Sequence, residues 1–287
     1  MDQNIIESCS SLKEYVLALI NVHFKDNLEL CQFLDMIDCK RRSKILVEKL
    51  GLVSPKQFHL IEEFEAFDLS KLPDEFVVKP CWGSSNRGVR ICKLEGEAIV
   101  DLVNNKSFSR KEFLFSYYDE SEQFSNYSKE FTIEERVYSK TNSGIFPMDY
   151  KIYTAGGKAI CIMQRDVNLG PEPEDWRYKY WLKNGISIES VNSKLTYEPN
   201  FSLPKNWREL IETAEKIASS LPIPFVRVDL FLNDTGVFFC ELTPKPGTYK
   251  TYDEDFDLFV GRQIRKALPW QITEIRDFLS HHEHLIW

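Results

Sequence analysis

One stretch decides the fold, and it reads FVRVDLFLNDTGVFFCELT over residues 225–243. It contains two apolar runs, residues 225–232 and 237–243, that are rich in β-branched and aromatic side chains. Between them lies Asn233-Asp234-Thr235-Gly236, a set of residues that favours a tight turn. The stretch therefore predicts two antiparallel strands joined as a hairpin.

Side chains alternate between the two faces of a strand, so the hairpin is predicted to have one apolar and one polar face. The apolar face would carry Val226, Val228, Leu230, Leu232, Phe238, Cys240 and Leu242. The polar face would carry Arg227, Asp229, Glu241 and Thr243. A turn centred near Thr235 places Asp229 directly opposite Glu241.

Two carboxylates that face each other repel unless a proton or a cation lies between them. Oxygen ligands from one or two carboxylates, completed by phosphate oxygens, are typical of a Mg²⁺–nucleotide site and not of a zinc site. The pair Asp229 and Glu241 therefore indicates a divalent metal site. The hairpin alone leaves a second interpretation open, in which the pair lies on a solvent-facing strand edge and the carboxylates diverge.

A second informative stretch reads FVVKPCWGSSNRGV over residues 76–89. Lys79 ends an apolar strand, where its ammonium group can reach a phosphate. The small residues that follow let backbone N–H groups approach phosphate oxygens; they are Gly83, Ser84, Ser85 and Gly88. The spacing excludes a P-loop. An ordinary hairpin turn remains the alternative for this stretch taken alone.

Periodicity predicts the remaining elements. Apolar residues at helical spacing predict helices within residues 10–52 and over residues 207–219. Short apolar or β-branched runs predict strands at residues 76–78, 88–92, 131–133, 150–153 and 159–163, with a helix at 97–103 between them. The aromatic-rich residues 175–181 are predicted to form a surface loop. Strands mixed with helices predict an α+β fold.

Composition excludes several classes of protein. The chain has 287 residues, 43% of them hydrophobic, which excludes a small disulfide scaffold and a disordered tail. Its seven cysteines form no Cys-x-x-Cys pair, and Cys92, Cys161 and Cys240 lie in apolar runs where buried thiols are expected. A net charge of -8 with scattered basic residues disfavours nucleic-acid binding.

The two ends of the chain carry weaker signals. The first residues contain neither an apolar stretch long enough for a membrane span nor the basic start of a signal peptide, which favours a cytoplasmic protein. The other end contains His281-His282-Glu283-His284, which we expect to be a solvated tail because no further ligands stand at the spacing of a structural metal site.

The hairpin and the Lys79 stretch together resemble the ATP-grasp superfamily, and the motifs follow the family's order from about Cys39 to Gly261. Three short motifs, Asp149-Tyr150-Lys151, residues 227–231 and Glu241-Leu242-Thr243, most resemble the TupA-like group of teichuronopeptide biosynthesis. The resemblance implies two α+β subdomains that grip ATP between them, with a short helical N-terminal region. It divides the chain into a helical N-terminal region (1–55), a nucleotide-binding subdomain (56–135), a catalytic and metal subdomain (136–270) and a C-terminal tail (271–287).

The resemblance also implies residues that bind ATP. They are Lys40, Lys79, Gly83, Ser84, Ser85, Gly88, Glu134, Val137 and Asp149. The two lysines correspond to the family's phosphate-binding lysines, although Cys39 stands where the family has an acid before the first of them. The small residues belong to the loop that closes over the triphosphate. The strand with Glu134 and Val137 corresponds to the one that holds adenine, and Asp149 falls where an acid holds the ribose.

The same pattern implies the metal ligands Asp229, Glu241 and Thr243 for Mg²⁺ or Mn²⁺, although many members have Asn at the last position. It implies that Arg227 stabilises the reacting phosphoryl or tetrahedral species. We add Lys151 as a source of positive charge and Arg165 as a candidate for binding the substrate carboxylate or the oxyanion. A surface ion pair is an equally open interpretation for Arg165.

The activity implied by the resemblance is that of an ATP-dependent carboxylate–amine ligase, which forms an amide through an acyl phosphate. Its partners would be a small-molecule or saccharide carboxylate and an amine, and its role would be in cell-envelope or capsular polysaccharide biosynthesis. Two alternatives stay open. One is a kinase that phosphorylates a hydroxyl group with the same nucleotide site, and the other is a nucleotide-binding module without catalysis.

Overall fold

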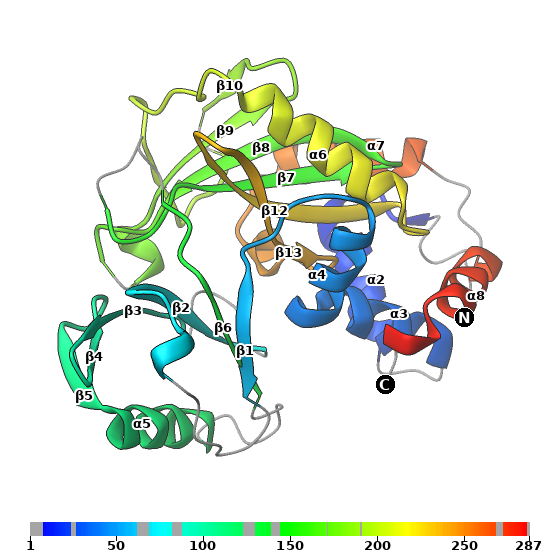
Figure 1. Cartoon of the computed structure of the whole chain (residues 1–287). Helices are drawn as coiled ribbons and strands as arrows, with labels where there is room; N and C mark the ends of the chain where they lie inside the picture. Colours follow the sequence, from blue (N-terminus) through cyan, green and yellow to red (C-terminus); the bar gives the residue numbers. More distant parts are fainter. Residues whose placement is uncertain are drawn as a thin grey trace. The chain divides into compact units, whose positions relative to one another are not determined.

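The computed structural model describes residues 8–23, 27–61, 69–81, 88–122, 130–138, 144–170, 172–189, 191–267 and 272–285. The chain divides into two compact units. Unit 1 comprises Met1–Val53, Ser139–Asn142 and Phe146–Trp287, and unit 2 comprises Ser54–Tyr138 and Ser143–Ile145. Unit 2 is therefore inserted into the chain of unit 1, and each unit has its own sheet and core (Figure 1).

Unit 2 is built on an antiparallel sheet. The strands, in spatial order, are β1 (Gln57–Ile61), β6 (Phe131–Glu135), β2 (Glu75–Pro80), β3 (Arg90–Glu95), β4 (Ala98–Asp101) and β5 (Lys106–Ser109). Burial alternates along β2, where Phe76 and Val78 are fully buried and their neighbours are half-buried. The helix α5 (Arg110–Glu122) packs against β4 and β5 and adds the buried Phe113 to this core.

Unit 1 contains the larger sheet, and α6 lies along one of its faces. The strands, in spatial order, are β10 (Ser187–Ile188), β9 (Arg177–Leu182), β8 (Lys158–Asp166), β7 (Asp149–Ala155), β12 (Phe225–Asn233) and β13 (Gly236–Thr243), with β11 (Thr196–Tyr197) beside β9. The helix α6 (Trp207–Ser219) packs on β7, β8 and β12, and its buried residues recur at helical spacing. The turn from β7 to β8 uses Gly156 and Gly157, whose positive φ angles of 55° and 72° suit glycine.

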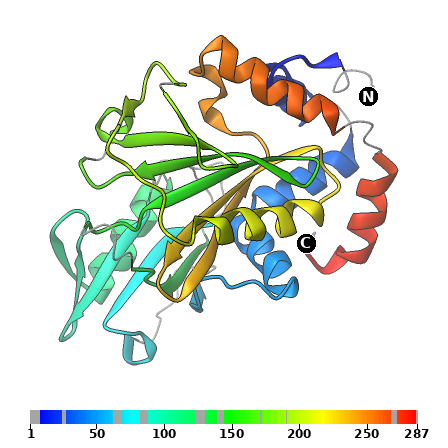
Figure 2. The same ribbon diagram turned by 90° about the horizontal axis from the view of Figure 1, so that it is seen from above.

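The helices α2 (Leu12–His23) and α7 (Glu254–Lys266) reach the other face of this sheet, opposite α6 (Figure 2). Phe225 of β12 contacts Tyr15 of α2 at a ring-centroid distance of 5.8 Å, and Tyr180 of β9 contacts Phe256 of α7 at 5.3 Å. The remaining helices of the described residues are α3 (Leu28–Asp38), α4 (Lys40–Lys49) and α8 (Ile272–His281). This face of the sheet is thus apolar where α2 and α7 cover it.

Several sequence predictions are confirmed by these elements. Helices α2, α3 and α4 lie within residues 10–52, and α6 spans residues 207–219 as predicted. The two strands of the hairpin pair with Asp229 opposite Glu241 and with Asn233 opposite Gly236 at the turn. Cys92 and Cys161 are buried free thiols, whereas Cys240 is only half-buried.

Three local predictions are wrong. The predicted helix at 97–103 is instead the strand β4, because Gly96 with φ 65° turns the chain back so that Ile99 pairs with Leu94. Most of the predicted loop at 175–181 is instead the strand β9, which begins at Arg177 and in which Tyr178, Tyr180 and Trp181 are buried. Its charged and aromatic residues alternate with the period of a strand.

The third correction concerns the apolar face of the hairpin. A register shift after Asp229 pairs Leu230 with Phe239 and leaves Cys240 as an extra residue in β13. The buried aromatic side chain is therefore Phe239, at 1% exposure, whereas Phe238 and Cys240 are half-buried. The extra residue also sets the predicted carboxylate pair. The register from Asn233 and Gly236 would place Cys240 opposite Asp229, and the shift brings Glu241 to that position instead.

The end of the chain forms α8 and a short 3-10 helix, Glu283–Leu285. His281 and His282 contact the carbonyl oxygens of Asp277 and Phe278 through their Nδ1 atoms, at 2.7 and 2.8 Å. In the described segments, none of the helices has both the length and the apolar composition that crossing a membrane requires.

Candidate active site

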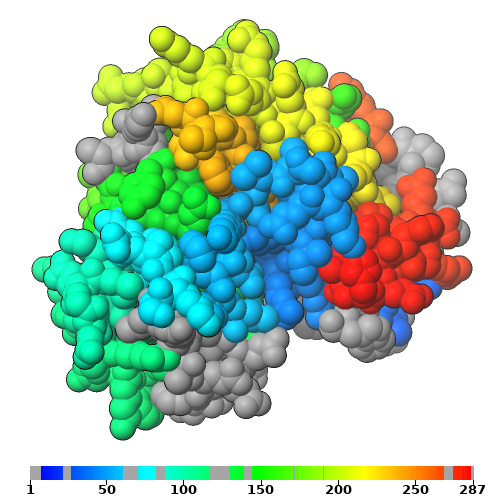
Figure 3. Space-filling view, viewed as in Figure 1, coloured from blue at the N-terminus to red at the C-terminus, as the bar shows by residue number. Residues whose placement is uncertain are grey.

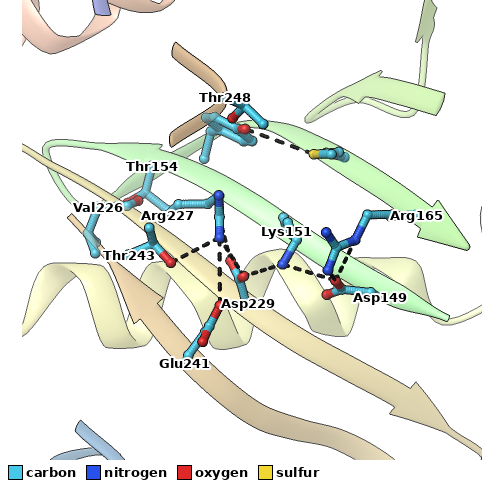
Figure 4. A network of polar contacts seen from close by, with 12 residues as sticks. Asp149, Lys151, Thr154, Arg165, Val226, Arg227, Asp229, Glu241, Thr243 and Thr248 are labelled. Atoms are coloured by element: carbon cyan, nitrogen blue, oxygen red, sulfur yellow. Dashed lines mark hydrogen bonds and ion pairs between the residues drawn. The ribbon is translucent and has the colours of Figure 1, made fainter. Parts of the chain in front are cut away.

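The polar residues of the hairpin lie on one face of the unit 1 sheet, beside polar residues of β7 and β8 (Figure 4). Asp229 of β12 has Glu241 of β13 opposite it on one side and Lys151 of β7 on the other. Asp149 lies two residues before Lys151 on the same face and pairs with Arg165 of β8. Strand pairing thus brings together residues that are far apart in the sequence.

Arg227 binds Asp229 through both carboxylate oxygens. Its Nε lies 2.6 Å from Oδ1, and its Nη2 lies 2.7 Å from Oδ2. The same Nη2 donates to the hydroxyl of Thr243 at 3.0 Å and lies 3.8 Å from Oε1 of Glu241. Asp229 is completely buried, and Arg227 is 8% exposed. One guanidinium group therefore relieves the repulsion between the two facing carboxylates.

Lys151 connects Asp229 to a third carboxylate, that of Asp149. Its Nζ donates to Oδ2 of Asp229 and lies 2.9 Å from Oδ2 of Asp149. Arg165 donates to the same Oδ2 of Asp149 from Nε at 2.9 Å and from Nη2 at 2.5 Å. The guanidinium carbon of Arg165 lies 4.7 Å from the ring centroid of Trp176, so an aromatic ring backs this ion pair.

Lys40 is the first residue of α4, which packs against β13. Its Nζ lies 3.7 Å from Oε2 of Glu241. Figure 3 shows α4 (blue) at the surface next to the hairpin (gold). The predicted phosphate-binding lysine and the predicted metal ligand therefore lie close together within unit 1.

The charges of this network shift the pKa of its members. Burial opposes ionisation of Glu241, but Lys40, Lys151 and Arg227 outweigh it and lower the pKa of Glu241 to about 2. Burial likewise disfavours the charged form of Arg227, yet the contact with Asp229 holds the pKa of Arg227 well above its usual value. Glu241 is therefore a carboxylate at neutral pH, which is the state that binds a cation.

The donor set fits a nucleotide-bound Mg²⁺ better than a metal held by protein alone. Mg²⁺ at such sites takes one or two carboxylates and completes its shell with phosphate oxygens and water. Asp229 and Glu241 supply two facing carboxylates, and Thr243 supplies a hydroxyl group beside them. Over the described ranges, no group of three or more His, Cys, Asp or Glu residues is placed to hold a metal ion.

Unit 2 contains the other predicted nucleotide-binding residues. Lys79 lies near the end of β2, and its Nζ contacts Oε2 of Glu134 on β6 at 2.5 Å. Oε1 of Glu134 accepts from the hydroxyl of Thr132 at 3.1 Å, and Val137 is buried. Gly88 has a φ of 69°, which suits glycine. Gly83, Ser84 and Ser85 lie outside the described residues.

Two residues of the network escaped the sequence analysis, Trp176 just before β9 and Tyr178 within it. Trp176 stacks on Arg165, and Tyr178 lies opposite Arg165 in the sheet. Burial, the largest cause, raises the pKa of Tyr178 to about 12, so its hydroxyl stays protonated. The alternation of charged and aromatic residues from Arg177 onward was the signal that could have identified this strand.

A family model described as TupA-like ATPgrasp matches residues 27–265, a range that includes all the predicted site residues, from Lys40 to Thr243. The chain belongs to the TupA-like ATP-grasp family. This confirms the resemblance derived from the hairpin and the Lys79 stretch. No curated protein sequence matches the chain significantly.

Several solved structures are similar to this chain of the TupA-like ATP-grasp family. The D-cycloserine synthetase DcsG has 15% identity and a TM-score of 0.51, over 89% of this chain and 79% of that one. An L-amino acid ligase from Bacillus licheniformis has 14% identity and a TM-score of 0.51, over 92% of this chain and 55% of that one. A D-alanine–D-alanine ligase from Helicobacter pylori has 21% identity and a TM-score of 0.48, over 82% of this chain. The alignment spans 60% of the H. pylori enzyme. At these identities the likeness shows the fold, and the ATP-grasp α+β fold is confirmed.

Proposed function

We propose that this chain is an ATP-dependent carboxylate–amine ligase that forms an amide, ADP and phosphate. The observation that carries the proposal is the face-to-face pair of Asp229 and Glu241, embedded among basic residues on one sheet face. Triphosphate and substrate carboxylate are both anionic, so a site that joins them needs positive charge as well as metal ligands. Membership in the TupA-like ATP-grasp family supports this assignment.

The proposed reaction has two steps. A carboxylate oxygen attacks the terminal phosphorus of ATP and forms an acyl phosphate while ADP leaves. The amine then attacks the carbonyl carbon, phosphate leaves with the bonding electrons, and the amine loses a proton to solvent. No side chain becomes covalently attached, so catalysis depends on alignment and on charge neutralisation.

Within unit 1, Asp229, Glu241 and Thr243 would hold Mg²⁺ or Mn²⁺. When bound, the metal ion would neutralise and align the phosphate oxygens. Lys40 at the start of α4 would bind phosphate, and Arg227 would stabilise the reacting phosphoryl group and the oxyanion. Arg165 is engaged with Asp149, and this favours its interpretation as part of a buried ion pair over a contact with substrate.

Within unit 2, we assign nucleotide binding to Lys79, Glu134, Val137 and the loop with Gly83, Ser84, Ser85 and Gly88. The contact of Lys79 with Glu134 holds the lysine near the end of β2. The proposed subdomains are residues 56–135 for the nucleotide and 136–270 for the metal and catalysis. Asp149 stands where the resemblance places a ribose-binding acid, but its buried contacts with Arg165 and Lys151 favour its interpretation as part of the ion-pair network.

We propose the substrate class from the family resemblance. The TupA-like resemblance favours a saccharide carboxylate such as a uronic acid, joined to an amino acid during cell-envelope or capsular polysaccharide biosynthesis in the cytoplasm. Because the proposal names the substrates by chemical class, the first experiment is one that works without the natural amine.

Isotope transfer provides that experiment. The protein would be incubated with ATP, Mg²⁺ and panels of uronic and amino acids whose carboxylates carry ¹⁸O, with hydroxylamine in place of the amine. We expect ADP, a hydroxamate and phosphate that contains ¹⁸O, because the acyl phosphate passes one carboxylate oxygen to phosphate.

The same mixture distinguishes the alternatives. A phosphorylated product without hydroxamate or free phosphate would identify a kinase. ATP binding without ADP release over the whole panel would identify a binding module. The variant Glu241→Gln is the control for background hydrolysis, because it removes a proposed metal ligand.

A further inference from the structure

Lys151 shares its ammonium group between two buried carboxylates. It donates to Oδ2 of Asp229 and lies 2.9 Å from Oδ2 of Asp149, and both carboxylates are at most 6% exposed. The strand register causes this arrangement, because Asp229 lies opposite Lys151 while Asp149 lies two residues away on the same face. The ammonium group of Lys151 can therefore bind either carboxylate through a change of its side-chain conformation alone.

Both carboxylate oxygens of Asp229 are bonded to cationic donors in this structure. Arg227 donates one hydrogen bond to each carboxylate oxygen, at 2.6 and 2.7 Å, and Lys151 donates another to Oδ2. A divalent cation that approached Asp229 would meet two positive charges already in contact with it. Glu241 is held more loosely, because Arg227 and Lys40 lie 3.8 and 3.7 Å from it.

Asp149 is occupied on one side only. Its Oδ2 receives Arg165 twice and Lys151 once, whereas its Oδ1 is buried and has no hydrogen-bond partner among the described residues. A buried carboxylate oxygen without a partner is costly, and an arriving ammonium group would satisfy it. Arg165, stacked on Trp176, holds Asp149 in position for such a contact.

We infer that Lys151 is a place-holding cation that leaves Asp229 for Oδ1 of Asp149 when a divalent cation binds at the hairpin. Asp149 is then a positioning residue that draws the lysine away from the metal ligand, and Arg165 keeps Asp149 in place. The inference rests on the proposed metal site at Asp229 and Glu241. It adds how the carboxylate of Asp229 becomes available to the metal ion.

The test is the affinity for Mn²⁺ without nucleotide, measured by electron paramagnetic resonance of the free ion. Removing the competing cation in Lys151→Met should tighten Mn²⁺ binding about tenfold or more, since a unit charge a few ångströms away acts strongly in a buried site. The variant Asp149→Asn removes the carboxylate to which Lys151 would move, and it should weaken Mn²⁺ binding by a similar factor. Lys158→Met is the matched control, because Lys158 lies on the same sheet but is exposed and paired with Glu215.

The double variant decides whether Asp149 acts through the lysine. In the Lys151→Met background, Asp149→Asn should leave Mn²⁺ affinity unchanged, because no lysine remains to be moved. A purely structural Asp149 would weaken Mn²⁺ binding equally in both backgrounds, and that result overturns the inference. Weaker or unchanged Mn²⁺ binding by Lys151→Met overturns it as well.

Asp149→Asn and Glu241→Gln each provide a separate test. If Lys151→Met does not fold, Asp149→Asn alone remains decisive, and an unchanged Mn²⁺ affinity for it overturns the inference. Glu241→Gln tests the metal site itself. If Glu241→Gln does not change Mn²⁺ binding, the proposed site is wrong; if it weakens Mn²⁺ binding while Lys151→Met does not tighten it, the site stands and the place-holding role is wrong.

Discussion

Asp229 and Glu241 face each other but differ in accessibility. Asp229 is completely buried and bonded to Arg227 and Lys151, whereas the side chain of Glu241 is 26% exposed and lies at the edge of the same network. A cation from solvent would therefore meet Glu241 first. Asp229 would join the metal shell only after its own ion pairs rearrange.

Arg227 has two possible roles that a single variant can separate. If its guanidinium group stabilises the transition state, Arg227→Met should slow the chemical step at least about a hundredfold, with a smaller loss of nucleotide affinity. Arg227→Lys should recover part of the rate, because it keeps the charge but not the planar fork that binds both oxygens of Asp229.

The measurement combines calorimetric binding of Mg-ATP with single-turnover kinetics on each variant. A large loss of affinity with an unchanged chemical step would show that Arg227 only anchors Asp229. Thermal melts without nucleotide measure the stability lost when the buried ion pair is broken. This loss can then be separated from the changes in nucleotide affinity and in the rate of the chemical step.

Glu241 should make the stability of the protein depend on acid pH. Its pKa falls from 4.5 to about 2 on folding, so its ionised form stabilises the folded state above pH 4.5. This contribution, on the order of 3 kcal/mol, is lost as the pH falls through about 2. The difference in unfolding free energy between the wild type and Glu241→Gln should therefore shrink between pH 5 and about 2.

Urea unfolding of both proteins at several pH values in this range would measure the difference. The comparison cancels the contributions of the other carboxylates, because both proteins contain them. A constant difference across the range would show that the cations around Glu241 do not stabilise its ionised form.

At the scale of elements, one face of the unit 1 sheet has an apolar part and a charged part. Tyr153 contacts Phe256 of α7, and Phe225 contacts Tyr15 of α2. Two residues further along the same strands lie Lys151 and Arg227. The helices thus exclude water from one part of the face and leave charged residues on the next part.

The packing of α7 against the start of α2 depends on Gly261. A Cβ atom at this position would lie 2.4 Å from the carbonyl oxygen of Ser10 and 2.4 Å from Cα of Ser11. Both are backbone atoms, so Gly261→Ala would force the helices apart. We expect a loss of about 1–3 kcal/mol or more in unfolding free energy.

Gly247→Ala is the matched control, because a Cβ atom there meets nothing within 4 Å. Denaturant unfolding of both variants gives the comparison. Equal stability of the two variants would show that α2 and α7 do not approach as closely as the structure describes.

At the scale of the whole molecule, the two units contribute different charges. Unit 1 carries the three carboxylates and four cations of the hairpin face, and unit 2 carries the ion pair of Lys79 with Glu134. If both units serve one nucleotide, variants in either unit should alter nucleotide binding. A site confined to unit 1 would not respond to changes in unit 2.

Lys79→Met tests the contribution of unit 2. We expect the affinity for ATP to fall about tenfold or more, because an ammonium group on a phosphate is a charge-assisted contact. Lys106→Met, at an exposed position of β5 in the same unit, should leave the affinity unchanged. Titrations with ATP measure the loss of binding, and melting curves without ATP measure the stability lost with the contact to Glu134. Equal affinities for the two variants would remove Lys79 from the nucleotide site.

The sequence determined much of this protein without any coordinates. Strand alternation and turn residues predicted the hairpin, because both depend on neighbours in one short stretch. The pairing of Asp229 with Glu241 was predicted as well, although the extra residue Cys240, which the sequence analysis did not predict, is what brings Glu241 opposite Asp229. The motif order from Lys40 to Thr243 identified the family that the family model also matches. Helical spacing located α6, since its amphipathic pattern follows from local geometry.

Only the tertiary structure decided which groups neutralise those carboxylates and how β9 is placed. Asp149, Lys151 and Arg165 meet Asp229 through strand pairing between β7, β8 and β12, and such long-range register leaves no mark in a local pattern. Residues 175–181 look like a polar loop because a strand of alternating charged and aromatic residues is stable only between neighbouring strands. Local propensity therefore established the hairpin, and the partners across the sheet gave it its electrostatic environment.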